Sequence, residues 1–275
     1  MAEILRYAAF SDTPKGGNPA GVVLDASDLS DAEMLAIAAD VGYSETAFLI
    51  GRLGPGAYRV RYFSPLAEVP FCGHATVGTA VALAHRDGPG DFLLSTNAGP
   101  VPVTVDDTLR ATLTSVAART KPLEDLETLL AALRWPAQEL DPQLPPLIAY
   151  AGAWHPIVAV TSRRRLAELD YDGPALKALM LAREWTTIQL VWRESPASFH
   201  VRNPFPVGGV YEDPATGAAA AALGGYLREL GLVTPPATLH LAQGDDLGRP
   251  GRLTVTLVPG EAGVRVSGTA VPIAS

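Results

Sequence analysis

The sequence predicts an α/β (α+β) protein made of two related halves, each with one buried central helix wrapped by strands. Many short β-like segments predict the strands. No residue from Ala75 to Ala84 is charged, and "DPATGAAAAALGGYLREL" is almost uncharged. A helix that is apolar on all sides is a buried helix. Each of these helices opens at a glycine between strand-like segments, so the second half repeats the plan of the first.

Composition sets the class of protein. The chain has 275 residues, 48% of them hydrophobic and 18% charged, which is typical of a globular protein. The net charge is -8 and the pI is about 5.1, which disfavours nucleic acid as a partner because a phosphate backbone attracts a basic surface. The one basic run, Arg163 to Arg165, is followed by acidic residues and predicts a solvated helix start rather than an anion site.

The chain has one cysteine, Cys72, so an internal disulfide is excluded. The opening "MAEILRYAAF" does not have the pattern of a signal peptide. No stretch approaches the roughly 18–20 apolar residues of a membrane helix. We therefore expect a soluble cytoplasmic protein.

The first half begins with a predicted strand over 3–10, a loop "SDTPKGGNPAG" and a strand over 22–25. A helix follows over 29–45, with Ser30 and Glu33 as a capping box and Gly42 as its stop. Further strands are predicted over 46–50 and 57–65 before the first buried helix, and over 91–96, 99–105 and 110–117 after it.

The pattern changes near Thr120. An amphipathic helix is predicted over 122–135, and strands return over 147–160, 186–193 and 198–203. The second buried helix follows. The last predicted strands cover 237–243, 251–259 and 263–271.

Common catalytic signatures are absent from the sequence. There is no Walker-type phosphate loop, no G-x-G-x-x-G, no G-x-S-x-G and no H-E-x-x-H, and the histidines and cysteine do not have structural-zinc spacing. We therefore expect no metal and no cofactor. Two polar helix starts remain, "FCGHATVG" and "EDPATGAA", whose backbone N–H groups could bind a carboxylate. Taken alone, Gly73 and Gly217 could instead serve only a tight turn.

Five segments resemble one family in their order and spacing. They are "GNPAGVV", "GYSETAFL", "VRYFSPLAEVPFCGHATVGTAVAL", "TNAGPVPV" and "EDPATGAAAAALGGYL". Together they resemble the PhzF-like phenazine-biosynthesis isomerases, which are similar in fold to diaminopimelate epimerase and proline racemase. The resemblance implies two pseudo-symmetric halves, each a central helix in a strongly curved mixed sheet. It implies an N-terminal half over 1–117, joined by the strand over 263–275, a C-terminal half over 118–262, an active site in the cleft between them, and a homodimer.

The resemblance also implies roles for individual residues. Glu45 matches the catalytic glutamate, and a carboxylate in a dry cleft has a raised pKa that suits proton transfer near neutral pH. His74 and Asp213 match the other polar catalytic residues. The residues expected to bind the substrate are Asn18, Gly73, Gly217 and Ala218.

Two positions, Cys72 and Ala218, bear on the chemistry of the site, and only Ala218 departs from the pattern of the family it resembles. Cysteine racemases of this fold need a thiol at each helix start, and one cysteine cannot supply both. Cys72 is interpreted as a small packed residue, and the alternative is a nucleophile paired with His74. Ala218 stands where the family commonly has serine, so a hydrogen bond to the substrate is lost there.

The expected function is a cofactor-independent isomerase in which Glu45 moves a proton on a small amino-acid-like or cyclic carboxylate of the trans-2,3-dihydro-3-hydroxyanthranilate type. Two alternatives stay open. One is a one-base epimerase or racemase of an amino acid derivative. The other is a small-molecule binding protein that has lost catalysis, which Ala218 would suit.

Overall fold

The computed structural model describes residues 2–274 of the chain. The chain forms two compact units. The first comprises Met1–Thr114 and Ser267–Ser275, and the second comprises Ser115–Val266. Among the residues described, no helix is both long and apolar enough to span a membrane.

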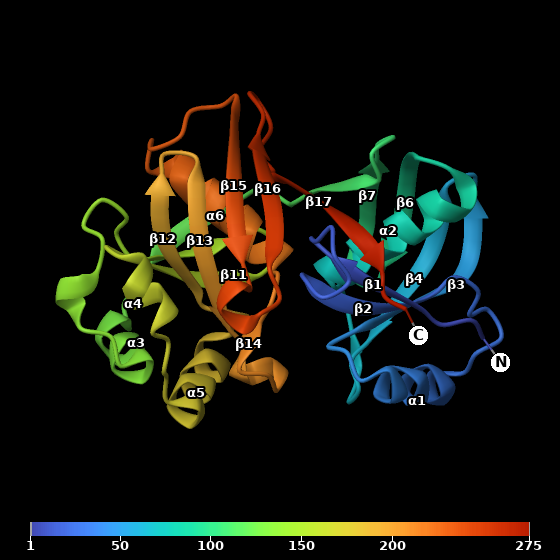
Figure 1. Cartoon of the computed structure of the whole chain (residues 1–275), viewed down its shortest axis with the longest axis horizontal. Coiled ribbons are helices and arrows are strands. Elements are labelled where there is room, and N and C mark those ends of the chain that lie inside the picture. Colours follow the sequence, from blue (N-terminus) through green and yellow to red (C-terminus); the bar gives the residue numbers. More distant parts are fainter. Residues whose placement is uncertain (1, 275) are drawn as a thin grey trace. The chain divides into compact units, whose positions relative to one another are not determined.

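The first unit is a closed barrel of eight strands (Figure 1). Neighbouring strands pair in the order β1-β2-β3-β4-β6-β7-β8-β17, and β17 pairs with β1 to close the ring. The strands of this unit are β1 (Leu5–Ala9), β2 (Asn18–Val23), β3 (Thr46–Gly54), β4 (Ala57–Phe63), β5 (Glu68–Val69), β6 (Gly90–Thr96), β7 (Gly99–Val105), β8 (Arg110–Thr114) and β17 (Arg265–Pro272). The short strand β5 pairs with β4 and immediately precedes the central helix.

Helix α2 (Gly73–Asp87) is the core of this barrel and packs on β1, β2, β3, β7 and β8. Every residue from His74 to Ala84 is buried. The small side chains allow this close packing. A Cβ added at Gly78 would lie 3.3 Å from the Cβ of Tyr7 on β1. The predicted buried helix is therefore confirmed, with Gly73 as its first residue.

Helix α1 (Asp31–Val41) has the caps that the sequence predicted. The Ser30 side chain accepts a hydrogen bond from the Glu33 amide, and the Glu33 carboxylate accepts one from the Ser30 amide. Gly42 ends the helix with φ of 70°, a left-handed conformation that glycine adopts readily. Met34 and Ala38 anchor the helix in a cluster of buried apolar side chains.

The second unit repeats the strand order of the first. Parallel strands β13 and β15 flank its central helix, as β4 and β6 flank α2, and a two-residue strand again precedes that helix. Its strands are β9 (Arg119–Pro122), β10 (Leu147–Tyr150), β11 (Trp154–Val160), β12 (Gln189–Ser195), β13 (Ser198–Pro204), β14 (Glu212–Asp213), β15 (Ala237–Gln243) and β16 (Gly251–Leu257). This shared order confirms the predicted duplication.

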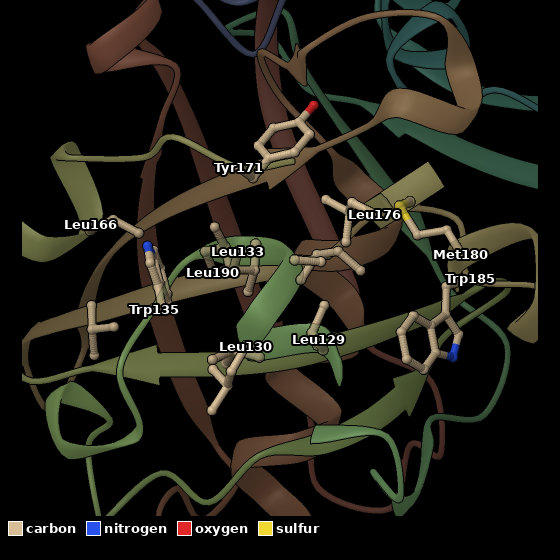
Figure 2. Close-up of a cluster of buried hydrophobic side chains, with 14 of the residues drawn as sticks. Leu129, Leu130, Leu133, Trp135, Leu166, Tyr171, Leu176, Met180, Trp185 and Leu190 are labelled. Atoms are coloured by element: carbon tan, nitrogen blue, oxygen red, sulfur yellow. The ribbon is translucent and has the colours of Figure 1, made fainter. Parts of the chain in front are cut away.

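The central helix of this unit is α6 (Gly217–Glu229), whose residues from Ala219 to Leu227 are buried. Three further helices are α3 (Leu126–Leu133), α4 (Arg163–Ala167) and α5 (Gly173–Arg183). Large side chains from α3 and α5 pack against the sheet (Figure 2). The labelled members of this core include Leu129, Leu133, Leu176, Met180 and Trp185.

Several predicted boundaries are wrong. Strand β2 begins at Asn18, inside the predicted loop. Pro19 has no backbone N–H to donate, and it is tolerated because β2 pairs only with β1 at this point. The parallel pairing of β2 with β3 begins at Gly21. The predicted strand over 147–160 is a hairpin of β10 and β11. Helix α5 was not predicted, although Asp172 caps it and Pro174 lies in its first turn. The arginine run does start a helix, as predicted.

Candidate functional site

The candidate site lies at one edge of the barrel, where β2 and β3 begin. These strands are parallel neighbours, with Gly21 opposite Thr46, and the Gly21 amide donates to the Glu45 carbonyl at 3.2 Å. Asn18 and Glu45 therefore lie at the same edge. Helix α2 begins there too, so its first turn brings His74 against both.

His74 is the centre of the polar contacts. Its Nδ1 lies 3.1 Å from Asn18 Nδ2, and its Nε2 lies 3.2 Å from Ser44 Oγ. Glu45 Oε2 lies 3.3 Å from the same Nε2. The structure thus brings together three residues that the sequence predicted for the site, Asn18, Glu45 and His74, and adds Ser44.

Cys72 occupies the N-cap position of α2 with an extended backbone, and its side chain does not cap the helix. Its thiol donates to Glu45 Oε2 at 3.4 Å, and its Sγ lies 3.4 Å from His74 Nδ1. The residue is buried, as expected of a packed cysteine. Its sulfur nevertheless faces the two polar groups rather than an apolar core.

Burial controls the ionisation of Glu45. Its side chain is 15% exposed. Desolvation raises the pKa of this carboxyl above its ordinary value, and hydrogen bonds from Ser44 and Cys72 partly oppose the increase. A carboxyl group of this kind can take and return a proton closer to neutral pH than an exposed one.

Gly73 is not required by packing. An added Cβ would meet only the ring of Phe71, at 4.0 Å, and its φ is outside the left-handed range. A tight turn therefore does not explain this glycine. The first N–H groups of a helix have no carbonyl acceptor within it and attract anions, and a residue without a side chain allows a ligand to approach them closely.

The remaining predicted residues belong to the second unit. Asp213 ends β14, is buried, and accepts a hydrogen bond from the Thr216 hydroxyl at 2.5 Å. Gln243 at the end of β15 donates to the Asp213 carbonyl and accepts from the Thr216 amide, which fixes the start of α6. Gly217 and Ala218 are the first two residues of α6.

Sequence reasoning missed three of these polar residues. Ser44 is adjacent to Glu45 and Thr216 lies within "EDPATG", so both stood inside quoted motifs without an assigned role. Gln243 had no sequence signal. It reaches Asp213 only because β13 and β15 pair in parallel, with Val201 opposite Gln243.

The comparisons with known proteins agree on the family. The family model for phenazine biosynthesis-like proteins, PhzC-PhzF, matches residues 7–275. An uncharacterized isomerase of Bacillus subtilis is 30% identical over 283 residues, covering 98% of this chain and 96% of the relative. A trans-2,3-dihydro-3-hydroxyanthranilate isomerase of Pseudomonas chlororaphis is 32% identical over 250 residues, covering 88% and 85%.

Solved structures give the same result. The crystal structure of a PhzF-family phenazine biosynthesis protein of Bacillus anthracis has a TM-score of 0.89 and 28% identity, with 99% of this chain and 97% of that chain covered. A hydroxyproline epimerase of Agrobacterium vitis has a TM-score of 0.65 at 15% identity, covering 98% and 90%, which shows the shared fold. The predicted epimerase-like fold and the predicted class, a PhzF-like isomerase, are confirmed. The chain belongs to the PhzC-PhzF family of phenazine biosynthesis-like proteins.

Proposed function

We propose that this protein is a cofactor-independent isomerase in which Glu45 moves a proton between two carbon atoms of a small carboxylate substrate. Glu45 removes the proton from an activated carbon and returns it elsewhere on the same molecule. No atom is gained or lost, so the net reaction is an isomerisation.

The observation that supports this proposal most strongly is the environment of the Glu45 carboxyl. It is largely buried, its pKa is raised by desolvation, and it contacts both His74 Nε2 and the Cys72 thiol. Burial favours the protonated form, so the group is poised to exchange a proton rather than to remain a fixed anion.

His74 is proposed to orient Glu45 and to assist proton delivery. Asn18 lies against the far nitrogen of the His74 ring, and a partner there fixes ring orientation and tautomer. Which nitrogen carries the proton follows from the hydrogen bond that the other one makes. In this proposal Asn18 acts on the substrate through His74.

The substrate carboxylate is proposed to bind at helix starts. Gly73 and Gly217 are the first residues of α2 and α6, and each would offer a backbone N–H to an anion. Asp213 would accept a hydrogen bond from an amine or hydroxyl of the substrate. These assignments rest on the family resemblance. A homodimer and a cytoplasmic location are proposed on the same basis.

The substrate class follows from the relatives. A relative named trans-2,3-dihydro-3-hydroxyanthranilate isomerase is 32% identical to this chain, so an amino-acid-like or cyclic carboxylate of that type is proposed. Ala218 has no polar group at the position where a serine hydroxyl is common in the family. We therefore expect weaker binding of that compound than a serine would give.

An NMR time course with trans-2,3-dihydro-3-hydroxyanthranilate in deuterated water tests this substrate. The proposal predicts conversion to an isomer, which carries deuterium at the newly protonated carbon to the extent that the Glu45 carboxyl exchanges its proton with solvent before returning it. It also predicts that Ala218→Ser raises kcat/KM. Deuterium entering recovered substrate at an inverted centre, without double-bond migration, would instead indicate an epimerase. A compound left unchanged by both proteins would exclude this substrate.

A further inference from the structure

The Glu45, Cys72 and His74 side chains form a cluster with three different metal-ligand types. One carboxylate oxygen, one thiol sulfur and one imidazole nitrogen lie within 4.8 Å of one another. The sequence did not indicate this cluster, because Cys72 and His74 are too close in the chain for the usual zinc spacing and Glu45 lies far from them in the sequence, just before β3. The start of α2 brings the three groups together.

The separation of Glu45 Oε2 and His74 Nε2 fits two corners of a tetrahedral ion. Zinc bonds of about 2.0–2.3 Å at tetrahedral angles place neighbouring ligand atoms roughly 3.3–3.6 Å apart. Glu45 Oε2 lies 3.3 Å from His74 Nε2 and 3.4 Å from Cys72 Sγ. Cys72 Sγ lies 3.8 Å from His74 Nε2. Cys72 Sγ lies closer to the other ring nitrogen, Nδ1, at 3.4 Å, so the thiol side chain must rotate toward Nε2 to complete the third corner. The fourth corner would be left for a water molecule or an anion.

Charge and outer contacts fit the same ion. A thiolate and a carboxylate carry two negative charges, so a divalent cation would make the cluster neutral at the positive end of α2. Metal-bound histidines usually donate their second N–H to a carbonyl or carboxylate oxygen. Asn18 stands at the second nitrogen of His74, and its amide oxygen would accept that hydrogen bond if the amide turned over.

We propose that Glu45, Cys72 and His74 form a three-ligand binding site for a thiophilic divalent cation, with Zn²⁺ as the ion of best fit. Thiolate and imidazole ligands favour Zn²⁺ over Mg²⁺ or Ca²⁺, which prefer oxygen. Binding displaces the thiol proton into solvent. The consequence for activity depends on the proposed function. An ion held by Glu45 prevents this carboxyl from transferring protons, so Zn²⁺ would inhibit the enzyme.

Cobalt provides a readout that does not depend on activity. Co²⁺ is added to the reduced, metal-stripped full chain, and the near-ultraviolet thiolate-to-cobalt charge-transfer absorption is followed. The proposal predicts a saturable band at one equivalent that Zn²⁺ abolishes by displacing Co²⁺. Cys72→Ser should remove the band completely. Glu45→Gln should keep the thiolate ligand but weaken Co²⁺ binding. The loss of an outer-shell partner alone costs about 10–100-fold in metal affinity, so the loss of a direct ligand should cost more than about 100-fold.

His200 provides the matched control. It lies near Glu194 and Asp245 and could bind ions weakly at the surface. His200→Asn should leave the band and its affinity unchanged. Circular dichroism of each variant confirms folding, and Glu45→Gln keeps the test decisive if Cys72→Ser does not fold. The absence of a band in the wild type, or a band that survives in Cys72→Ser, would overturn the proposal. Neither result would bear on proton transfer by Glu45.

Discussion

Glu45 Oε2 lies 3.3 Å from His74 Nε2, although one residue precedes strand β3 and the other is in the first turn of helix α2. The contact exists because β3 and α2 begin at the same edge of the barrel. It joins a largely buried carboxyl to a buried imidazole next to the only thiol of the chain. The chemistry proposed for the protein depends on this contact.

The raised pKa of Glu45 predicts a pH-dependent stability difference. The folded protein holds this proton at pH values where the unfolded chain, with a pKa near 4.5, releases it. Folding therefore gains most from this group below pH 4.5, and the gain is lost as the pH rises through the raised value. Glu45→Gln cannot titrate, so its stability relative to wild type should increase as the pH rises above 4.5.

Urea unfolding of both proteins at several pH values measures this difference. Glu127→Gln is the control, because Glu127 is exposed on α3. Its stability relative to wild type should change little across the same range. A difference for Glu45→Gln that stays flat or falls with pH would show that burial does not raise the pKa of Glu45.

Two arginine–glutamate pairs at equivalent strands of the two units should contribute differently to the free energy of unfolding. Arg61 on β4 pairs with Glu68 on β5, and Arg202 on β13 pairs with Glu212 on β14. The side chains are 16% and 28% exposed in the first pair but 7% and 0% exposed in the second. Glu212→Gln leaves the buried Arg202 guanidinium without its close carboxylate partner, with only Asp246 at 4.0 Å, and should cost about 3–5 kcal/mol of unfolding free energy.

Glu68→Gln is the natural comparison. Arg61 keeps its second partner, Asp31, at 2.6 Å, so the loss should be about 1 kcal/mol or less. Thermal or urea unfolding of the two variants compares the pairs directly. Equal losses would contradict the idea that burial sets the strength of these two pairs.

Close packing around α6 predicts an overpacking effect. A Cβ at Gly225 would lie 2.3 Å from the Cβ of Ala118, and something must move. Gly225→Ala should therefore cost about 1–3 kcal/mol of unfolding free energy, despite the better helix propensity of alanine. At Gly51 an added Cβ meets nothing within 4 Å, so Gly51→Ala should cost far less. A neutral Gly225→Ala would show that Ala118 moves away freely.

The sequence revealed elements whose signals are local. The capping box of Ser30 and Glu33 and the stop at Gly42 define α1 without reference to the rest of the chain. The uncharged run from Ala75 to Ala84 revealed a buried helix because its apolar character does not depend on what surrounds it. The family resemblance supplied Glu45 and His74 as a pair.

Features set by strand pairing could not be predicted in this way. The start of β2 at Asn18 depends on its pairing with β1, and the contact of Gln243 with Thr216 depends on β15 pairing with β13. The approach of Cys72 to Glu45 spans 27 residues of sequence and requires both α2 and β3 to be in place. Local patterns do not specify such distances.

The most direct test of the account is the isomerisation rate of Glu45→Gln beside wild type and Glu127→Gln, measured by NMR with trans-2,3-dihydro-3-hydroxyanthranilate in deuterated water. Removing a positioned acid–base group typically costs about 10²–10⁴-fold in rate. We expect Glu45→Gln to lose at least about 100-fold, and Glu127→Gln to match wild type. If Glu45→Gln isomerises the compound as fast as wild type, Glu45 does not carry the proton and the proposed mechanism is wrong.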